Sequence, residues 1–407
     1  MRRILLLALA QCAVLGSLTA PAVVGLSILV RSLVGADAAP PALAMVVAAG
    51  SATAMVANPL FGWAADRSRV GRRVWLAGGA VAGLLASAAV VFAADAVWLA
   101  AAWMLAQAAY NACFGAINGL LSAHLTPQNR TRAAGVFSAA SIIGALPGLA
   151  LAALLPHSVT GMILAVPAVA AVAILLIARR LPDDDGPASR TGHVRPAIRP
   201  VLTRPFLAAA LVRFVLSVEL AAGLTFGLYL FLDRWRLPEV EAVRLVSLAT
   251  LLGAVGVAAT AALIASSPLA RADPRSILAV GLVLLAAAMV GRGLATAIGP
   301  FLVATAVAGV GIGAGYTATR SLVQAALPPE SSAFGLGIFN VANTLAPVVA
   351  PLLAGALLLP RSEPWLLDSY GTMYVLLAIP VLACLGALPW LRYSTGSRPM
   401  NFIRSSP

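Results

Sequence analysis

Residues 62–73 read GWAADRSRVGRR and lie between two long apolar runs. They hold one Asp and four Arg, in a chain that is 61% hydrophobic and only 10% charged. Arginine-rich segments of this kind flank membrane helices on the cytoplasmic side. The stretch therefore predicts a cytoplasmic turn between two membrane spans, and the rest of the sequence can be read outward from it.

The apolar runs around this turn are long enough to cross a membrane. A spanning helix needs about 20 apolar residues, and the mean hydropathy of +0.96 over 407 residues reflects many such runs. We predict an all-α polytopic membrane protein with twelve transmembrane helices. The expected spans are residues 4–31, 41–65, 74–94, 97–124, 133–155, 159–179, 206–232, 240–267, 276–296, 299–326, 333–359 and 370–391.

All 27 basic residues are arginines, and they are distributed unevenly between the spans. With the N-terminus inside, the inner segments hold 19 of them and the outer segments hold 5, while Arg213, Arg292 and Arg320 fall inside spans. This bias predicts a multi-pass protein of the cytoplasmic membrane with both termini in the cytoplasm. The net charge of +13 follows this membrane pattern, so we expect a lipid bilayer and not nucleic acid as partner. We also expect a monomer.

The chain divides into two similar parts. A polar segment with three consecutive Asp and several Pro separates six predicted spans from six more, which places the domain boundaries at residues 1–180, 181–205 and 206–407. Residues 125–140 and 327–342 share Leu, Pro, Gly, Phe and Ala at five positions, each pair 202 residues apart. Parallel six-helix halves of this kind are a known plan for transporters.

The turn at residues 62–73 resembles the loop signature of the major facilitator superfamily, and the six-plus-six duplication matches that fold over essentially the whole chain. Three residues separate the Asp-Arg pair from the next Gly, where the usual signature has one. This lengthened form, with residues 125–135 and 337–351, resembles the glycoside–cation symporters and their sucrose-transporter-like relatives. The resemblance implies a secondary transporter whose halves rock around a central site, with a sugar as the first substrate to consider.

The charges of the turn suggest a cytoplasmic gate. A carboxylate at a helix end can accept hydrogen bonds from an arginine and from the N-terminus of a neighbouring helix. The glycines would permit close helix approach and a tight turn. The alternative is an arginine cluster that only sets the orientation in the membrane. The candidate gate residues are Gly62, Asp66, Arg67, Gly71, Arg72 and Arg73.

Glu219 is the only acid that falls well inside a predicted span. A charge at mid-bilayer is costly, so it is expected to face a cavity or a partner. One interpretation is a proton-coupling site, with Arg320 as its partner; the other is a structural ion pair with an arginine of the ninth or tenth span. Arg213 and Arg292 lie nearer span ends, where long side chains can extend to the membrane surface.

Amide and phenol side chains inside spans are candidates for binding a substrate, although many such groups bond only to neighbouring helices. Gln107, Asn111 and Asn118 are four and seven residues apart, so we expect them to share one face of the fourth span. The further candidates are Tyr316, Asn340 and Asn343.

The sequence argues against an enzyme, a metal site or a cofactor. No His or Cys pair has the spacing of metal ligands, and the absence of Lys excludes an ATP-binding loop of the Gly-Lys-Ser/Thr kind. The glycines of residues 309–315 lie in an apolar span and predict close helix packing, not a dinucleotide loop. We predict a proton-coupled secondary transporter of a small solute, with a sugar as the first candidate. The alternatives are a proton-antiport exporter of drugs or metabolites, which an apolar cavity would favour, and a non-transporting receptor or assembly factor.

Overall fold

The computed structural model describes residues 2–68, 70–124, 130–181, 202–327, 332–358 and 367–391, and these residues are almost entirely helical. The N-terminal helices are α1 (Arg2–Ala20), η1 (Pro21–Gly25), α2 (Leu26–Val34), α3 (Ala39–Arg67), α4 (Arg72–Val91), α5 (Ala96–His124), α6 (Arg130–Leu154) and α7 (Val159–Arg180). The C-terminal helices are α8 (Arg204–Tyr229), η2 (Leu230–Arg234), α9 (Glu239–Ser266), η3 (Pro268–Arg271), α10 (Pro274–Leu294), α11 (Ile298–Ala326), α12 (Ser332–Leu357), α13 (Ser369–Ala383) and η5 (Cys384–Leu391).

The prediction of twelve transmembrane helices is confirmed. The first three helices run on without interruption, as do α8 with η2 and α13 with η5, so that twelve long helical segments result. Ten helices in the described part of the chain are long and apolar enough to cross a membrane, and α6 contributes a shorter apolar stretch, Ile143–Leu154. Most of the predicted linker lies outside the described residues.

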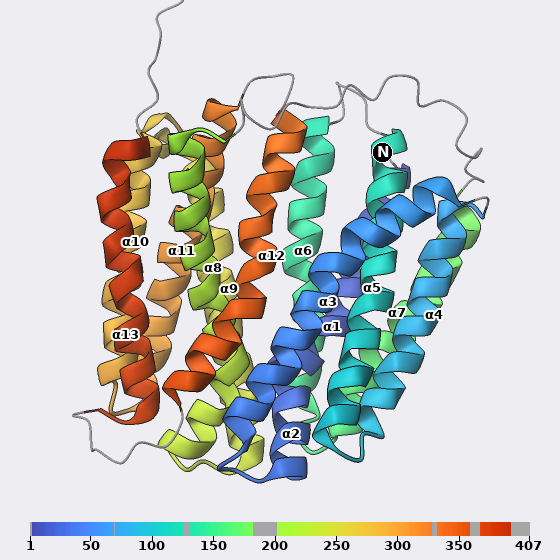
Figure 1. The fold of residues 1–407 in the computed structure, drawn as a ribbon, viewed down its shortest axis with the longest axis horizontal. Helices are drawn as coiled ribbons and strands as arrows, with labels where there is room; N and C mark the ends of the chain where they lie inside the picture. Colours follow the sequence, from blue (N-terminus) through green and yellow to red (C-terminus); the bar gives the residue numbers. More distant parts are fainter. Residues whose placement is uncertain are drawn as a thin grey trace, which may run out of the picture.

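The helices cross the bundle from end to end, and the N-terminal and C-terminal helices occupy opposite sides of it (Figure 1). Within each side, α4 packs on α5 and α7, and α10 packs on α11 and α13. Between the sides, α12 packs on α3 and α6 packs on α9. One end of the bundle carries the N-terminus and the ends of α7 and α8, and we call it the linker face. The opposite end carries the α2–α3 and η2–α9 connections, and we call it the distal face.

Glycines in α11 allow its neighbours to approach closely, as the sequence predicted. A Cβ atom added at Gly309 would collide with the backbone oxygen of Gly253 in α9. At Gly311 it would lie 2.7 Å from the backbone oxygen of Gly281 in α10. At Gly315 it would lie 2.5 Å from Leu216 in α8. Small residues let membrane helices pack backbone to backbone, so α11 can contact three helices at once.

Candidate functional site

A cavity of about 440 Å³ lies inside the bundle. Helices α1, η1 and α6 line it from the N-terminal side, and α8, η2, α9, α10, α11 and α13 line it from the C-terminal side. Its wall is built mainly from leucine, valine, alanine, glycine and phenylalanine side chains. The polar residues of the lining are Thr19, Glu219, Thr250, Arg292, Thr305 and Tyr374.

The cavity holds a buried ion pair. Arg292 Nη1 of α10 lies 3.1 Å from Glu219 Oε1 of α8, and the two side chains are 11% and 2% exposed. Glu219 Oε2 is buried without a hydrogen-bond partner among the described residues. Arg292 also donates through Nε to Thr305 Oγ1 over 3.2 Å, and its guanidinium carbon lies 5.2 Å from the centre of the Tyr374 ring. The arginine is therefore supported from two further helices, while the carboxylate is held through one oxygen.

The expectation that Arg320 pairs with Glu219 is wrong, as is the expectation that Arg292 extends to the membrane surface. Arg320 is exposed. Arg320 lies six residues, or about 9 Å, from the end of α11 at the linker face. Measured from the same face, Glu219 lies about 22 Å along α8, and Arg292 lies about 27 Å along α10. The helical rise thus brings Glu219 and Arg292 to a similar depth. The observed Glu219–Arg292 pair matches the other prediction from the sequence, an ion pair with an arginine of the ninth span, which is α10.

Two contacts close the distal face between the N-terminal and C-terminal helices. Arg31 Nη1 of α2 lies 2.7 Å from Asp233 Oδ1 of η2, and Tyr229 Oη of α8 donates to the Ser27 carbonyl over 2.8 Å. Tyr370 Oη of α13 donates to the second Asp233 oxygen over 2.7 Å. Both contacts between the two sides join residues that are 202 positions apart, the same offset as the sequence repeat. We call Arg31, Asp233, Ser27 and Tyr229 the distal latch.

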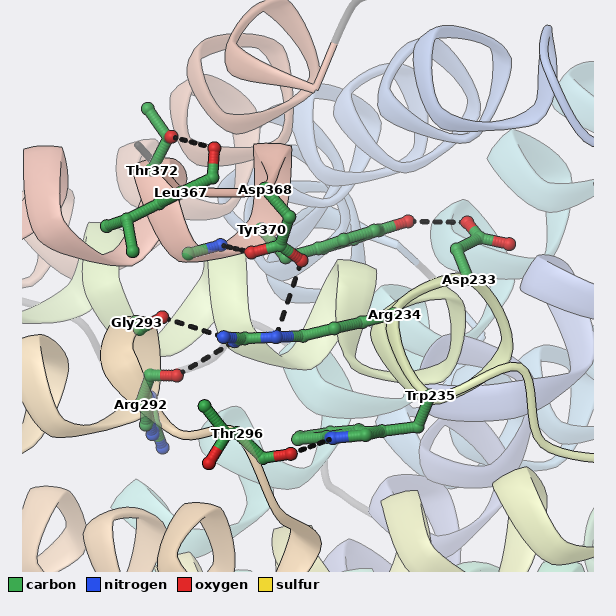
Figure 2. A network of polar contacts seen from close by, with 11 residues as sticks. Asp233, Arg234, Trp235, Arg292, Gly293, Thr296, Leu367, Asp368, Tyr370 and Thr372 are labelled. Atoms are coloured by element: carbon green, nitrogen blue, oxygen red, sulfur yellow. Dashed lines mark hydrogen bonds and ion pairs between the residues drawn. The ribbon is translucent and has the colours of Figure 1, made fainter. Parts of the chain in front are cut away.

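Next to the latch, Arg234 ties together the ends of α10 and α13 (Figure 2). Its guanidinium donates to the carbonyls of Arg292 and Gly293 over 3.0 and 2.8 Å. Its Nε lies 3.4 Å from Asp368 Oδ2, and Asp368 caps the N-terminus of α13 by accepting from the Gly371 amide. The last carbonyls of a helix lack partners within it. Arg234 supplies these partners at the end of α10, so the backbone that carries Arg292 is held beside the latch.

The sequence profile of the Major Facilitator Superfamily matches residues 5–351 of the chain. The chain belongs to the major facilitator superfamily. Its members are transporters and not enzymes, so this protein is a secondary transporter of a small solute in a membrane.

Solved structures show the same fold. A mutant of the nucleoside transporter NupG superposes with a TM-score of 0.76 at 14% identity, covering 96% of this chain and 99% of that one. A bacterial homologue of the human lysosomal transporter Spinster, inward-facing and unoccupied, gives 0.71 at 14% identity, covering 96% and 95%. A bacterial homologue of the iron transporter ferroportin, outward-facing, gives 0.63 at 17% identity, covering 96% and 99%. No curated protein matches the chain.

Three of the predicted substrate residues of this transporter gather in a second polar cluster, outside the cavity lining. Arg213 donates through Nε to Asn343 Oδ1 over 2.6 Å, and its guanidinium carbon lies 3.3 Å from the centre of the Tyr316 ring. Ser217 and Tyr316 share a hydrogen bond of 2.9 Å, and Asn343 donates to Asn340 over 2.9 Å. Arg213 therefore contacts α11 and α12 side chains, contrary to the expectation that it extends to the membrane surface.

The three predicted residues of α5 do not line the cavity. Asn111 is buried, Gln107 is partly buried and Asn118 is exposed, so they do not share one environment. Asn111 accepts from Asn58 of α3 over 3.2 Å and donates to the Gln107 carbonyl over 2.8 Å. These are bonds within and between neighbouring helices, the alternative role that the sequence allowed.

The turn at residues 62–73 connects α3 to α4 at the linker face. A Cβ atom on Gly115 of α5 would lie 2.8 Å from the Gly62 amide nitrogen, whereas a Cβ atom on Gly62 would lie 4.0 Å from Gly115 Cα, an ordinary contact. The close approach of α3 and α5 therefore requires glycine at position 115, and not at position 62 as the sequence predicted. A Cβ atom on Gly119 would likewise lie 2.7 Å from Arg72 Nε. Gly71 adopts φ −59° and ψ 153°, angles open to any residue, so the turn does not need glycine there. The side chains of Asp66 and Arg67 lie outside the described part of the structure.

Proposed function

We propose that this transporter moves a small, largely apolar solute through the central cavity together with protons, and that Glu219 is the proton-binding residue. The observation that carries the proposal is the position of Glu219. It is the one buried acid among the described residues, it lines the cavity, and one of its oxygens is left without a partner. Ionisable groups inside a membrane protein mark ion pathways and proton relays. A protonated Glu219 could release Arg292, which would change the cavity at the point where solute binds.

The cavity wall favours an apolar metabolite over a sugar. Each of the three threonines donates its hydroxyl proton to a carbonyl four residues earlier in its own helix: Thr19 to Leu15, Thr250 to Val246 and Thr305 to Phe301. A hydroxyl has a single proton to donate, so these groups have no second one for a substrate. A sugar presents many hydroxyls, whereas this lining offers mainly apolar side chains. The proposal therefore shares the apolar solute of the exporter alternative, but not its proton antiport, and it departs from the sugar that the resemblance to glycoside–cation symporters implies.

Transport would proceed by rocking of residues 1–180 against residues 206–407. The distal latch closes one face between these two parts, and the turn at residues 62–73 lies at the other face. We assign Asp66, Arg67, Arg72 and Arg73 to the gate of that second face. The excess of arginines at the linker face supports a cytoplasmic location for it and for both termini.

The test uses purified protein in liposomes with an imposed pH gradient. Aromatic acids, aromatic amides and sugars are added in turn, and a pH-sensitive dye inside the vesicles records proton movement. We expect an aromatic solute, but no sugar, to move protons with wild-type protein. The Glu219→Gln variant should bind the solute without moving protons. Solute flux that is the same with and without the gradient would disprove proton coupling, and unchanged coupling in Glu219→Gln would disprove the role of Glu219.

A further inference from the structure

We infer that the transported solute carries one negative charge, and that its anionic group takes the place of Glu219 on Arg292 when Glu219 binds a proton. This rests on the proposed function and names the class of solute that the same cavity accepts: a small amphipathic monoanion such as an aromatic carboxylate. The proton and the anion would then cross the membrane together.

The charges that face Glu219 support this choice. Arg292 from α10 contacts it directly, Tyr374 from α13 lines the same cavity, and Arg234 of η2 lies behind Arg292. The other lining helices contribute apolar side chains and threonines. An arginine keeps its charge at any physiological pH. A cationic solute would therefore place two cations against one carboxylate in a buried site, whereas an anion would meet an arginine that the proton has released.

The geometry lets Glu219 leave without moving Arg292. The carboxylate contacts the guanidinium through Oε1 alone. Arg292 is meanwhile held by Thr305 at its side chain and by Arg234 at its backbone carbonyl. Its position therefore does not depend on Glu219.

Space for the incoming anion lies one helical turn from Glu219. Gly223 lines the cavity, and a Cβ atom there would lie 3.7 Å from Arg292 Nη1. Because residue 223 has no side chain, it does not cover that nitrogen, and Arg292 itself lines the cavity. A planar carboxylate can then accept two parallel hydrogen bonds from the guanidinium.

Charge balance supplies the coupling. The empty site holds Glu219 as an anion and Arg292 as a cation, and the loaded site holds neutral Glu219, cationic Arg292 and an anionic solute. Both sum to zero. Binding of the proton alone or of the anion alone leaves one uncompensated charge near mid-bilayer, which would make the crossing rarer by about a hundred-fold. Only the empty and the doubly loaded forms would cross readily.

The experiment compares three probes with the same aromatic body: 3-phenylpropionate, 3-phenylpropionamide and 3-phenylpropylammonium. Titration calorimetry with detergent-purified protein, in buffers that differ in ionisation enthalpy, gives both affinity and proton uptake. At mildly acidic pH we expect the carboxylate to bind more tightly than the amide and the ammonium by about tenfold or more. Its binding should take up a proton in wild type and none in Glu219→Gln.

Arg292→Gln should abolish the preference for the carboxylate. Because this variant leaves Glu219 unpaired, the double variant Glu219→Gln/Arg292→Gln is measured beside it, and should bind the amide and the carboxylate equally. Arg275→Gln removes an arginine that pairs with an acid over 2.8 Å outside the cavity, and should keep the preference.

A wild type that does not prefer the carboxylate, including one that binds none of the probes, would overturn the inference. So would a double variant that still prefers the carboxylate. Proton movement with the amide in liposomes, but not with the carboxylate, would overturn the inference and leave the proposed function standing. A lack of proton movement with every solute would refute the proposed function itself.

Discussion

The distal latch yields a quantitative prediction for Asp233→Asn. Opening of the distal face must break the Arg31–Asp233 ion pair and the Tyr229–Ser27 hydrogen bond, because each joins N-terminal to C-terminal helices. Asparagine keeps an oxygen that can accept from Tyr370 but removes the charge that attracts Arg31. The substitution should therefore weaken the closed state and leave the C-terminal helices intact.

The size of the effect follows from exposure. The side chains of Arg31 and Asp233 are 28% and 30% exposed, and their charged atoms are 2.7 Å apart. A hydrogen bond to a charged group contributes about 1.5–3 kcal/mol, whereas exposed ion pairs contribute about 0.2–1 kcal/mol. A partly exposed pair at this distance should contribute about 1 kcal/mol. Its loss would raise the ratio of distal-open to distal-closed molecules about five-fold.

Distances between spin labels provide the assay. Asp37 lies in the α2–α3 connection, Glu241 lies in the first turn of α9, and both are exposed. With the three native cysteines replaced, labels at these two positions report the opening of the distal face. We expect the ratio of long-distance to short-distance molecules to increase about five-fold in Asp233→Asn. Asp368→Asn is the matched control, because Asp368 pairs with Arg234 wholly within the C-terminal helices. An unchanged distribution in Asp233→Asn, or an equal change in the control, would refute the assignment.

Three further predictions concern helix packing at Gly309, the contacts of Arg234 and the pKa of Asp273. Gly309→Ala should lower the stability of the detergent-solubilised protein by about 1–3 kcal/mol, because α9 must move away from the added methyl group. Gly299→Ala is the control and should leave stability unchanged, because an added Cβ atom there meets nothing within 4 Å. Thermal unfolding compares the two variants. Arg234→Gln should lower the free energy of unfolding by about 2–4 kcal/mol, because it removes a charged donor from two carbonyls and an acid. The same variant should reduce proton-coupled flux. Wild-type stability together with wild-type flux would contradict the role of Arg234. Hydrogen bonds from Arg275 lower the pKa of Asp273 in the α9–α10 connection. The ionised carboxylate therefore stabilises the folded state at pH values above the pKa of Asp273 in the unfolded chain. This contribution is lost as the pH falls through the lower pKa of the folded state. Arg275→Gln should raise the Asp273 pKa toward the ordinary value, as a carbon-13 titration of the carboxyl would detect; an unchanged pKa would show that Arg275 does not lower it.

The twelve helices could be predicted because each span carries its own signal. A bilayer requires every backbone polar group to be satisfied within its own segment, so the length and hydropathy of a run are enough to identify a helix. The glycines of residues 309–315 were likewise interpretable in isolation, since their lack of side chains has the same consequence in any tight bundle.

Partnerships between charges are harder to predict. The sequence identifies Glu219 as a candidate site, but it favours Arg320 as the partner and places Arg292 at the membrane surface. The distance of a residue from the end of its own helix indicates its depth for that helix alone, whereas the pair depends on how α8 and α10 lie beside each other. One usable signal is present: an arginine inside a span is itself a candidate functional residue, and this applies to Arg213 and Arg292 alike.

The latch shows a second signal that could have been used. Arg31 and Asp233 are separated by the offset of the internal repeat, so they occupy equivalent positions in the two halves. Equivalent residues meet only if they lie close to the axis that relates the halves, and the sequence does not say which positions do so.

The sequence of residues 62–73 was enough to predict a turn between two spans and a resemblance to the superfamily, because hydropathy and residue order are local properties of the chain. Which side chains line the cavity depends on the rotation of each helix about its axis and on its neighbours, and these emerge only when all the helices pack together.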